Sequence, residues 1–287
     1  MAEETVVLSR WRWTGVSNEQ PPRDPSNEAF WYDFLTVGSP NERRNRRIFR
    51  LLPHGPRCRL CAAPFAGAAA PVMRMIGKRP ADHNPNWCSS CFDFITEHHG
   101  GAEIELTLLF ADIRGSTGMA EGMSPGAYRA ILDRFYDVAA QAIIDHDGFV
   151  DKFVGDEVVA TFAPMLSGER HTAQAVEAAQ ELLRKTGHDA PDGPWVALGA
   201  GVHTGMAWMG AVGEGPHTAL TALGDTVNVA ARLAALAQPG EILITAEAAT
   251  AAGIGDGLER RVLDLRGKQQ QTEVVALQIG PMRSAVA

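Results

Sequence analysis

LTLLFADIRGST, residues 106–117, is the stretch of sequence that decides the fold. Its apolar half is typical of a buried strand, and this strand ends at Asp112 in a turn of small residues. A second stretch, FVDKFVGDEVVATF (residues 149–162), has the pattern of two strands joined by a Gly-Asp turn that presents Asp156. Magnesium is usually held in proteins by one or two carboxylates. The two aspartates therefore predict one metal site, provided that the strand before Asp112 lies beside this hairpin.

The composition is that of a globular protein with a substantial core. The chain has 287 residues, of which 45% are hydrophobic and 21% are charged. A net charge of −8 argues against a nucleic-acid partner, since proteins that bind nucleic acids are usually basic. The N-terminus lacks the pattern of a signal peptide. The longest apolar stretch, residues 195–212, is glycine-rich and is expected to form the two strands of a hairpin. We therefore expect a cytoplasmic protein without a transmembrane segment.

All four cysteines lie in two CxxC pairs separated by 26 residues, at Cys58, Cys61, Cys88 and Cys91. Each pair can offer two adjacent thiolates to one tetrahedral ion, and the arrangement resembles a treble-clef zinc finger. Zn²⁺ and an iron–sulfur cluster both suit four thiolates. Because four protein ligands close the coordination shell, we expect a structural role. In a cytosolic chain, such a cluster is more typical of a metal site than of disulfides.

The chain is expected to divide into three parts. Residues 1–50 form a helical and irregular segment, residues 51–100 the small metal-binding module, and residues 103–279 the largest domain. The first part contains a run of arginines on an expected helix, and we interpret this run as a solvated basic face, with an anion or partner contact as the alternative. Its members are Arg43, Arg44, Arg46, Arg47 and Arg50.

The largest domain shows strand and helix patterns in a mixed order. Ser124 and Pro125 are good residues for the start of a long helix, which Gly148 ends. The other expected elements are strands at 104–111, 149–154, 157–162, 196–204, 207–212 and 241–244, helices at 170–185 and from 225, and strand segments within 261–278. This order predicts an α+β fold with a mixed sheet flanked by helices.

Three segments resemble the signature segments of the class III nucleotidyl cyclase catalytic domain. They are LLFADIRGST, DKFVGDEVVATF and TALGDTVNVAARL, and they occur in the family's order and approximate spacing between residues 103 and 277. The resemblance implies a ferredoxin-like mixed sheet and an adenylate cyclase. Such an enzyme converts ATP to 3′,5′-cyclic AMP and pyrophosphate with two Mg²⁺ or Mn²⁺ ions per active site.

The resemblance also assigns roles to individual residues. Asp112 and Asp156 match the two metal-binding aspartates, and the backbone carbonyl of Ile113 would be a further metal ligand. Lys152 matches the lysine that selects the purine and suits the N1 acceptor of adenine. Thr221 stands where the adenylate-selective pattern often has Asp, as in a bacterial subgroup with Thr or Ser at this position. A hydroxyl still accepts a hydrogen bond from the adenine amino group, but it discriminates less sharply than a carboxylate.

The remaining matches concern the ribose and the phosphates. Asn228 and Arg232 are four residues apart, so they share one face of a helix. They match the ribose-orienting asparagine and the phosphate-stabilising arginine of the family. The segment LRGKQQQTEVVAL resembles the one that supplies a cation to the terminal phosphates, with Lys268 as the candidate and Arg266 as the alternate.

In the resembled family, the two aspartates and the other substrate-binding residues come from opposite subunits. This chain carries both sets, so the resemblance implies a head-to-tail homodimer with two shared active sites. A guanylate cyclase and a non-catalytic, cyclase-like nucleotide or redox sensor are the alternative functions.

Overall fold

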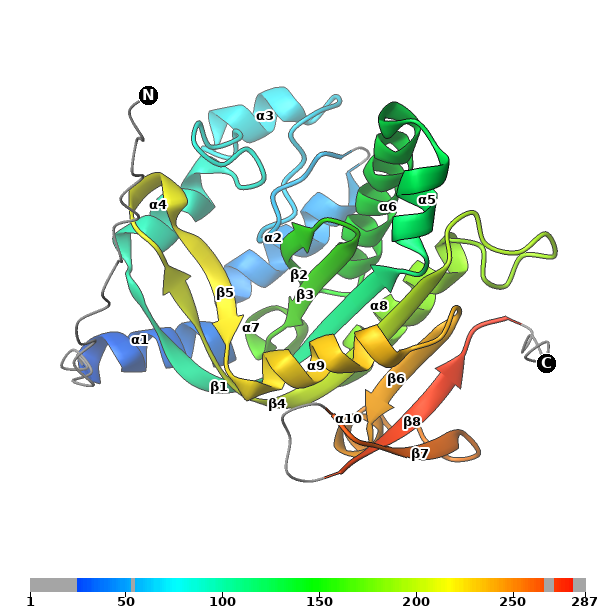
Figure 1. Ribbon diagram of the computed structural model, residues 1–287. Helices are drawn as coiled ribbons and strands as arrows, with labels where there is room; N and C mark the ends of the chain where they lie inside the picture. The colour runs from blue at the N-terminus through cyan, green and yellow to red at the C-terminus, as the bar shows by residue number, and fades with distance from the viewer. Residues whose placement is uncertain (1–24, 53–54, 266–270, 281–287) are drawn as a thin grey trace, which may run out of the picture.

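The computed structural model describes residues 25–52, 55–265 and 271–280, and in this part of the chain the strands form one eight-stranded mixed sheet (Figure 1). The strand order is β2-β3-β1-β4-β6-β8-β7, and β5 pairs with β4 outside this path. Neighbouring strands are antiparallel except β4 and β6. The strands are β1 (Gly100–Ile113), β2 (Phe149–Val154), β3 (Glu157–Phe162), β4 (Leu198–Val212), β5 (Ala219–Leu223), β6 (Glu241–Thr245), β7 (Glu259–Leu263) and β8 (Thr272–Gln278).

Helices cover both faces of the sheet, which confirms the expected α+β fold with flanking helices. Helices α6 (Pro125–Asp145) and α8 (His171–Lys185) pack on one face. Helix α9 (Asp225–Leu236), helix α1 (Pro25–Thr36) and the cysteine-containing segment pack on the other face. The remaining helices are α2 (Pro40–Leu51), α3 (Ala70–Met75), α4 (Ser89–Glu97), α5 (Ser116–Gly122), α7 (Pro164–Ser167) and α10 (Ala246–Ala251).

Strand β1 is buried on both faces and connects the two halves of the core. Leu106, Leu108 and Phe110 join the cluster under α1 and α9, whereas Leu109 and Ile113 join the cluster under α6 and α8. This alternation follows from the two-residue period of a strand. Because both faces are filled with apolar side chains, the register of β1 against its neighbours is strongly specified.

The expectation of two strands within residues 196–212 is wrong, because β4 is one continuous strand of 15 residues. It pairs with β1 along its whole length, from Leu198 opposite Ile113 to Ala211 opposite Gly100. Its glycines serve close packing instead of a turn. A Cβ at Gly201 would collide with the backbone of α9.

The interpretation of the arginine run as a solvated basic face is wrong for Arg46, whose side chain is only 1% exposed. Its guanidinium donates hydrogen bonds to the carbonyl oxygens of Leu60 and Gly148, and its Nε lies 3.7 Å from the Asp147 carboxylate. Arg50 lies 3.0 Å from the same carboxylate. Burial lowers the pKa of Arg46 to about 10, so the side chain remains charged at neutral pH. Arg46 therefore ties α2, the cysteine segment and the residues before β2 together.

Replacing Arg46 by alanine should strongly destabilise the protein, because it leaves the buried carbonyl groups of Leu60 and Gly148 without their donor and removes one of the two arginines that face Asp147. The expected loss in the free energy of unfolding is about 3–5 kcal/mol, the usual cost of breaking a buried ion pair. Arg47 on the same helix is exposed, so Arg47→Ala should change the free energy by less than about 0.5 kcal/mol. Urea titration of both variants measures the difference. Equal stability of the two variants would contradict a structural role for Arg46.

Candidate functional site

The carboxylates of Asp112 and Asp156 come together at the edge of the sheet where β1 ends. Strands β1 and β3 are paired, with Asp112 opposite Glu157, and the Ile113 N–H donates to the Asp156 carbonyl at 3.2 Å. Asp156 follows Gly155, whose φ of 61° is in the left-handed region that glycine favours. The condition for a shared site is therefore met. The roles of Asp112, Ile113 and Asp156 in metal binding remain predictions.

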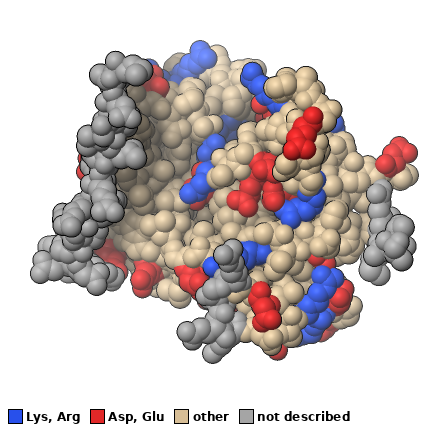
Figure 2. Space-filling model, viewed as in Figure 1, with Lys and Arg blue, Asp and Glu red and all other residues tan. Residues whose placement is uncertain are grey.

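The surroundings of the two aspartates favour a cation. Burial raises the pKa of Asp112 to about 6, the Arg114 guanidinium opposes this rise, and Asp156 adds to it. Burial and the charges of Asp112 and Asp156 raise the pKa of Glu157 to about 7. The three carboxylates thus repel one another, with the Arg114 guanidinium as the adjacent cation, and a divalent ion would relieve this repulsion. Figure 2 shows the acidic side chains gathered over the end of β1 and the β2–β3 hairpin, with basic ones beside them.

Arg114 also connects this site to α9. It forms an ion pair with Asp112 and donates to the carbonyl oxygen of Ala235 at 3.2 Å, near the end of the helix. The sequence pattern does not single out Arg114 or Glu157. Their positions directly beside the two aspartates in the quoted stretches are the signal that would have suggested them.

Lys152 and Thr221, which are 69 residues apart, meet between β2 and β5. The Lys152 Nζ lies 3.2 Å from the Thr221 Oγ1. The Thr221 hydroxyl donates to the Asp151 carboxylate at 2.6 Å, and the Lys152 Nζ lies 3.6 Å from the same oxygen. The strand is irregular between Val150 and Lys152, so Asp151 and Lys152 both reach Thr221. In a regular strand these two side chains would point to opposite faces, which is why the sequence does not predict Asp151 here.

Asn228 and Arg232 lie on α9 as predicted, one turn apart. Asn228 is exposed and Arg232 is half-buried. Among the described residues, neither side chain has a hydrogen-bond partner, so both are free to contact a ligand. Lys268 and its alternate, Arg266, lie outside the described residues. Figure 2 shows that the face carrying α9 is hollowed between β5 and the β2–β3 hairpin.

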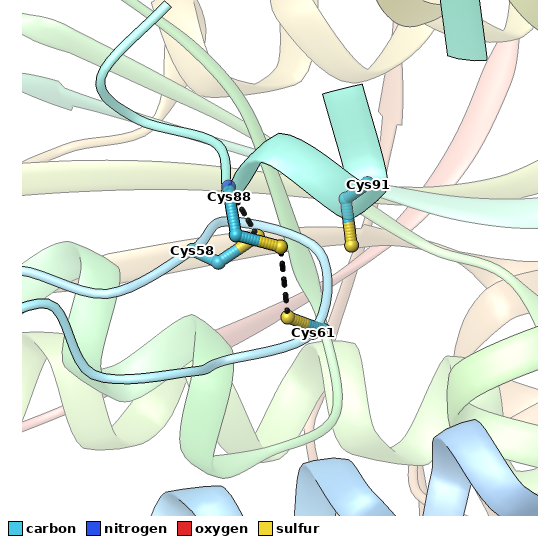
Figure 3. A group of neighbouring side chains, drawn as sticks. All are labelled: Cys58, Cys61, Cys88 and Cys91. Carbon is cyan, nitrogen blue, oxygen red and sulfur yellow. Dashed lines mark hydrogen bonds between the residues drawn. The ribbon is translucent and has the colours of Figure 1, made fainter. Parts of the chain in front are cut away.

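The four cysteines form a second candidate site on the same side of the sheet (Figure 3). Their sulfur atoms lie within 4.8 Å of one another, and the Sγ atoms of Cys61 and Cys88 are 3.6 Å apart. Tetrahedral thiolates around zinc, with Zn–S bonds of ~2.3 Å, lie about 3.8 Å from one another. All four residues are buried without a disulfide. The group therefore fits one metal centre, and zinc and an iron–sulfur cluster both remain possible occupants.

Local structure explains how the cysteines converge. The Cys58 N–H donates to the Ala63 carbonyl and the Ala62 N–H to the Cys58 carbonyl, each at 2.9 Å, which closes a tight turn around the first pair. Cys88 precedes the first residue of α4, and Cys91 lies in its first turn. Burial opposes ionisation of Cys58, but hydrogen bonds from the other three thiols outweigh burial and hold its pKa well below the usual range. The same hydrogen bonds raise the pKa values of Cys61 and Cys91, so without a metal the cluster stabilises one thiolate, at Cys58.

The cysteine segment contacts the strand that carries Lys152. Arg59 donates to the Asp151 carbonyl at 3.1 Å and lies over the Phe153 ring, 5.5 Å from its centre. The rings of Trp87 and Phe149 are 5.5 Å apart. A cavity of about 950 Å³ lies between this segment, α6 and β2, and Lys152 is part of its lining. The cysteine segment therefore supports one wall of the space beside Lys152.

Comparison with known proteins places this arrangement in a family. Residues 101–276 match the adenylate and guanylate cyclase catalytic domain. The chain belongs to this family. The cysteine segment and the N-terminal helices precede the matched cyclase domain. No helix among the described residues is long and apolar enough to cross a membrane.

Relatives of the cyclase domain include adenylate cyclases. The chain is 33% identical over 174 residues to adenylate cyclase 1 of Rhizobium meliloti (strain 1021), covering 58% of this chain and 26% of that protein. It is 32% identical over 186 residues to an adenylate cyclase of Anabaena cylindrica, covering 59% of this chain and 36% of that protein. The chain thus spans only about a quarter to a third of the length of these two relatives.

Solved cyclase structures share the fold. The guanylyl cyclase Cya2 aligns with a TM-score of 0.55 and 26% identity over 62% of this chain and 93% of that chain. The adenylyl cyclase CyaB from P. aeruginosa aligns with a TM-score of 0.55 and 24% identity over 64% of this chain and 98% of that chain. The cyclase domain of this chain is therefore nearly as long as these two solved chains.

Cys58→Ser should lower the melting temperature by about 10 °C or more, because a structural metal site contributes several kcal/mol to folding. Removal of the metal from the unmodified protein by a chelator should cause a similar loss. Met75→Ala, which truncates an exposed side chain in the same segment, should have little effect. Thermal unfolding and elemental analysis measure these effects. A protein without bound metal, or an unchanged melting temperature in Cys58→Ser, would contradict the metal centre.

Proposed function

We propose that the protein is an adenylate cyclase that converts ATP to 3′,5′-cyclic AMP and pyrophosphate. The observation that carries this proposal is the contact between Lys152 and Thr221 at 3.2 Å. The lysine offers a donor to N1 of adenine, and the threonine hydroxyl offers an acceptor to the adenine amino group. Membership of the cyclase family and the adenylate cyclases among the relatives support the same assignment.

The other site residues would act on the ribose and the phosphates. Mg²⁺ or Mn²⁺, bound by Asp112 and Asp156 with the carbonyl of Ile113, would lower the pKa of the ribose 3′-hydroxyl and neutralise phosphate charge. Asn228 would orient the ribose. The planar guanidinium of Arg232 would stabilise the charge that develops on the α-phosphate.

The proposed active enzyme is a head-to-tail homodimer with two shared sites. Lys152, Thr221, Asn228 and Arg232 of one subunit would meet the aspartates of the other. Exposed apolar side chains on the β2–β3 hairpin, the β4–β5 hairpin and α9 support an interface on this face, since water-exposed apolar groups are often covered by a partner. They are Val154, Met206, Leu223 and Leu236.

The metal centre would hold the substrate-binding strand in place. Arg59, between Cys58 and Cys61, reaches the backbone of Asp151 and the ring of Phe153. We therefore assign a structural role to the cysteine segment in the proposed enzyme, with residues 51–100 as a module that supports the cyclase domain.

A guanylate cyclase is the second candidate, because Thr221 provides no carboxylate to reject guanine and Cya2, at 26% identity, is a guanylyl cyclase. Incubation of the purified protein with ATP or GTP, in the presence of Mg²⁺ or Mn²⁺, followed by mass spectrometry of the product, decides between the two. Cyclic AMP as the main product supports the proposal. Cyclic GMP as the main product, or no cyclic product with either nucleotide, refutes it.

Asp112→Asn and Arg232→Ala should each reduce kcat by about 100-fold or more, because the first removes a ligand of the catalytic metal and the second removes a cation that stabilises the charge developing on the α-phosphate. Mixing the two inactive variants should restore about a quarter of the wild-type activity. Random exchange makes half of the dimers mixed, and each mixed dimer has one intact site of two.

The matched control is a mixture of Asp112→Asn with Asp156→Asn. In this mixture each site of the mixed dimer lacks one of its two aspartates, so activity should not recover. Rates are measured after denaturant-free subunit exchange, with dimer formation checked by light scattering. Failure of the first mixture to recover activity would refute shared sites.

A further inference from the structure

Asp151 occupies an unusual position beside the Lys152–Thr221 contact. Its side chain is only 4% exposed, and its Oδ2 accepts the Thr221 hydroxyl at 2.6 Å and lies 3.6 Å from the Lys152 Nζ. Buried carboxylates are costly unless they are paired. Here Thr221 and Lys152 face the side-chain carboxylate, and Arg59 binds the backbone carbonyl of the same residue.

The hydrogen-bond direction at Thr221 follows from this geometry. A hydroxyl has one hydrogen and two lone pairs, whereas an ionised carboxylate only accepts hydrogen bonds. The single hydrogen of Thr221 is therefore committed to Asp151. Lys152 donates to the same hydroxyl oxygen. A ligand that approaches this oxygen meets only an acceptor.

We propose that Asp151 is a positioning residue for base selection, which fixes the Thr221 hydroxyl as an acceptor and so favours a 6-aminopurine over a 6-oxopurine. This inference rests on the proposed function and adds the residue that orients the Thr221 hydroxyl as a hydrogen-bond acceptor. Adenine presents an amino donor and the N1 acceptor, which match the Thr221 acceptor and the Lys152 donor. Guanine presents an O6 acceptor and an N1–H donor, so both contacts become unfavourable.

Without Asp151, the hydroxyl of Thr221 could rotate. It would then donate to O6 of guanine as readily as it accepts from the amino group of adenine, because a hydroxyl serves in both ways. The irregularity of β2 between Val150 and Lys152 is what brings the carboxylate to Thr221. The sequence neighbours Asp151 and Lys152 thus act as one unit, the first through Thr221 and the second on the base directly.

The test compares kcat/KM for ATP, GTP and purine riboside triphosphate, which lacks the 6-amino group. In Asp151→Asn, the preference for ATP over GTP should fall by about tenfold, the effect of one base-reading contact. The preference for ATP over purine riboside triphosphate should fall as well. Asp137→Asn, an exposed acid on α6 that lines the adjacent cavity, should leave both ratios unchanged.

A double-mutant cycle separates positioning from a general structural effect. Thr221→Val removes the hydroxyl, so adding Asp151→Asn to this variant should not change the ATP to GTP ratio further. The inference would be overturned if Asp151→Asn changed the ATP to GTP ratio equally in the wild-type and Thr221→Val backgrounds. An unchanged ratio in Asp151→Asn alone would overturn it as well.

Two further measurements keep the test decisive. If Asp151→Asn does not fold, the wild-type protein should still use purine riboside triphosphate about tenfold less efficiently than ATP, and equal use would overturn the inference.

Equilibrium titration with ATP and GTP applies even if the protein lacks cyclase activity. An inactive protein that binds ATP better than GTP, and loses this preference in Asp151→Asn, refutes the proposed function but supports the role of Asp151. A wild-type preference for GTP overturns both.

Discussion

The pairing of β1 with β3 and β4 is the constraint on which the candidate active site depends. Because the side-chain period of a strand is two, a slip of one residue would move Asp112 to the opposite face of the sheet. Apolar residues fill both faces of β1, and this double burial fixes the register that sets Asp112 opposite Glu157. The same pairing carries β4 past α9 at Gly201, where only a glycine lets the helix approach. Arg114 can then join the end of β1 to the end of α9.

A second theme is that buried charge holds the N-terminal part of the chain against the cyclase domain. Arg46 reaches from α2 to carbonyl groups of the cysteine segment and of Gly148, and it is neutralised by Asp147. Arg59 reaches from the cysteine segment to the backbone of Asp151. Both contacts converge on the few residues that begin β2. Loss of either arginine leaves a buried polar group without a partner. The position of β2 therefore depends on both α2 and the cysteine segment.

Prediction from the sequence succeeds where the signals are local. The β2–β3 hairpin has the predicted bounds because strand patterns flank a Gly-Asp turn, and α6 begins at Pro125 because Ser124 accepts a hydrogen bond from the Ala127 N–H. It fails where the deciding partner is distant. The burial of Arg46 depends on residues about 100 positions away, and the continuity of β4 depends on glycines that pack against α9. Asp151 reaches Thr221 because of the pairing of β2 with β3, which no pattern within β2 reveals.

The placement of a carboxylate behind a hydroxyl has an energetic consequence for substrate binding. A carboxylate that faces the base directly must lose its water when the nucleotide binds, and this loss opposes affinity. Asp151 is already buried and paired with Thr221 and Lys152 in the free protein. The free-energy cost of removing its water is therefore part of folding and does not oppose substrate binding. Of the Thr221–Asp151 pair, only the neutral hydroxyl is then desolvated by the base. This arrangement also makes base selection depend on the stability of the fold around β2. On the proposed function, anything that shifts β2, including disruption of the cysteine cluster beside Arg59, would release the Thr221 hydroxyl and weaken the discrimination between purine bases before it affected Asn228 and Arg232 on α9.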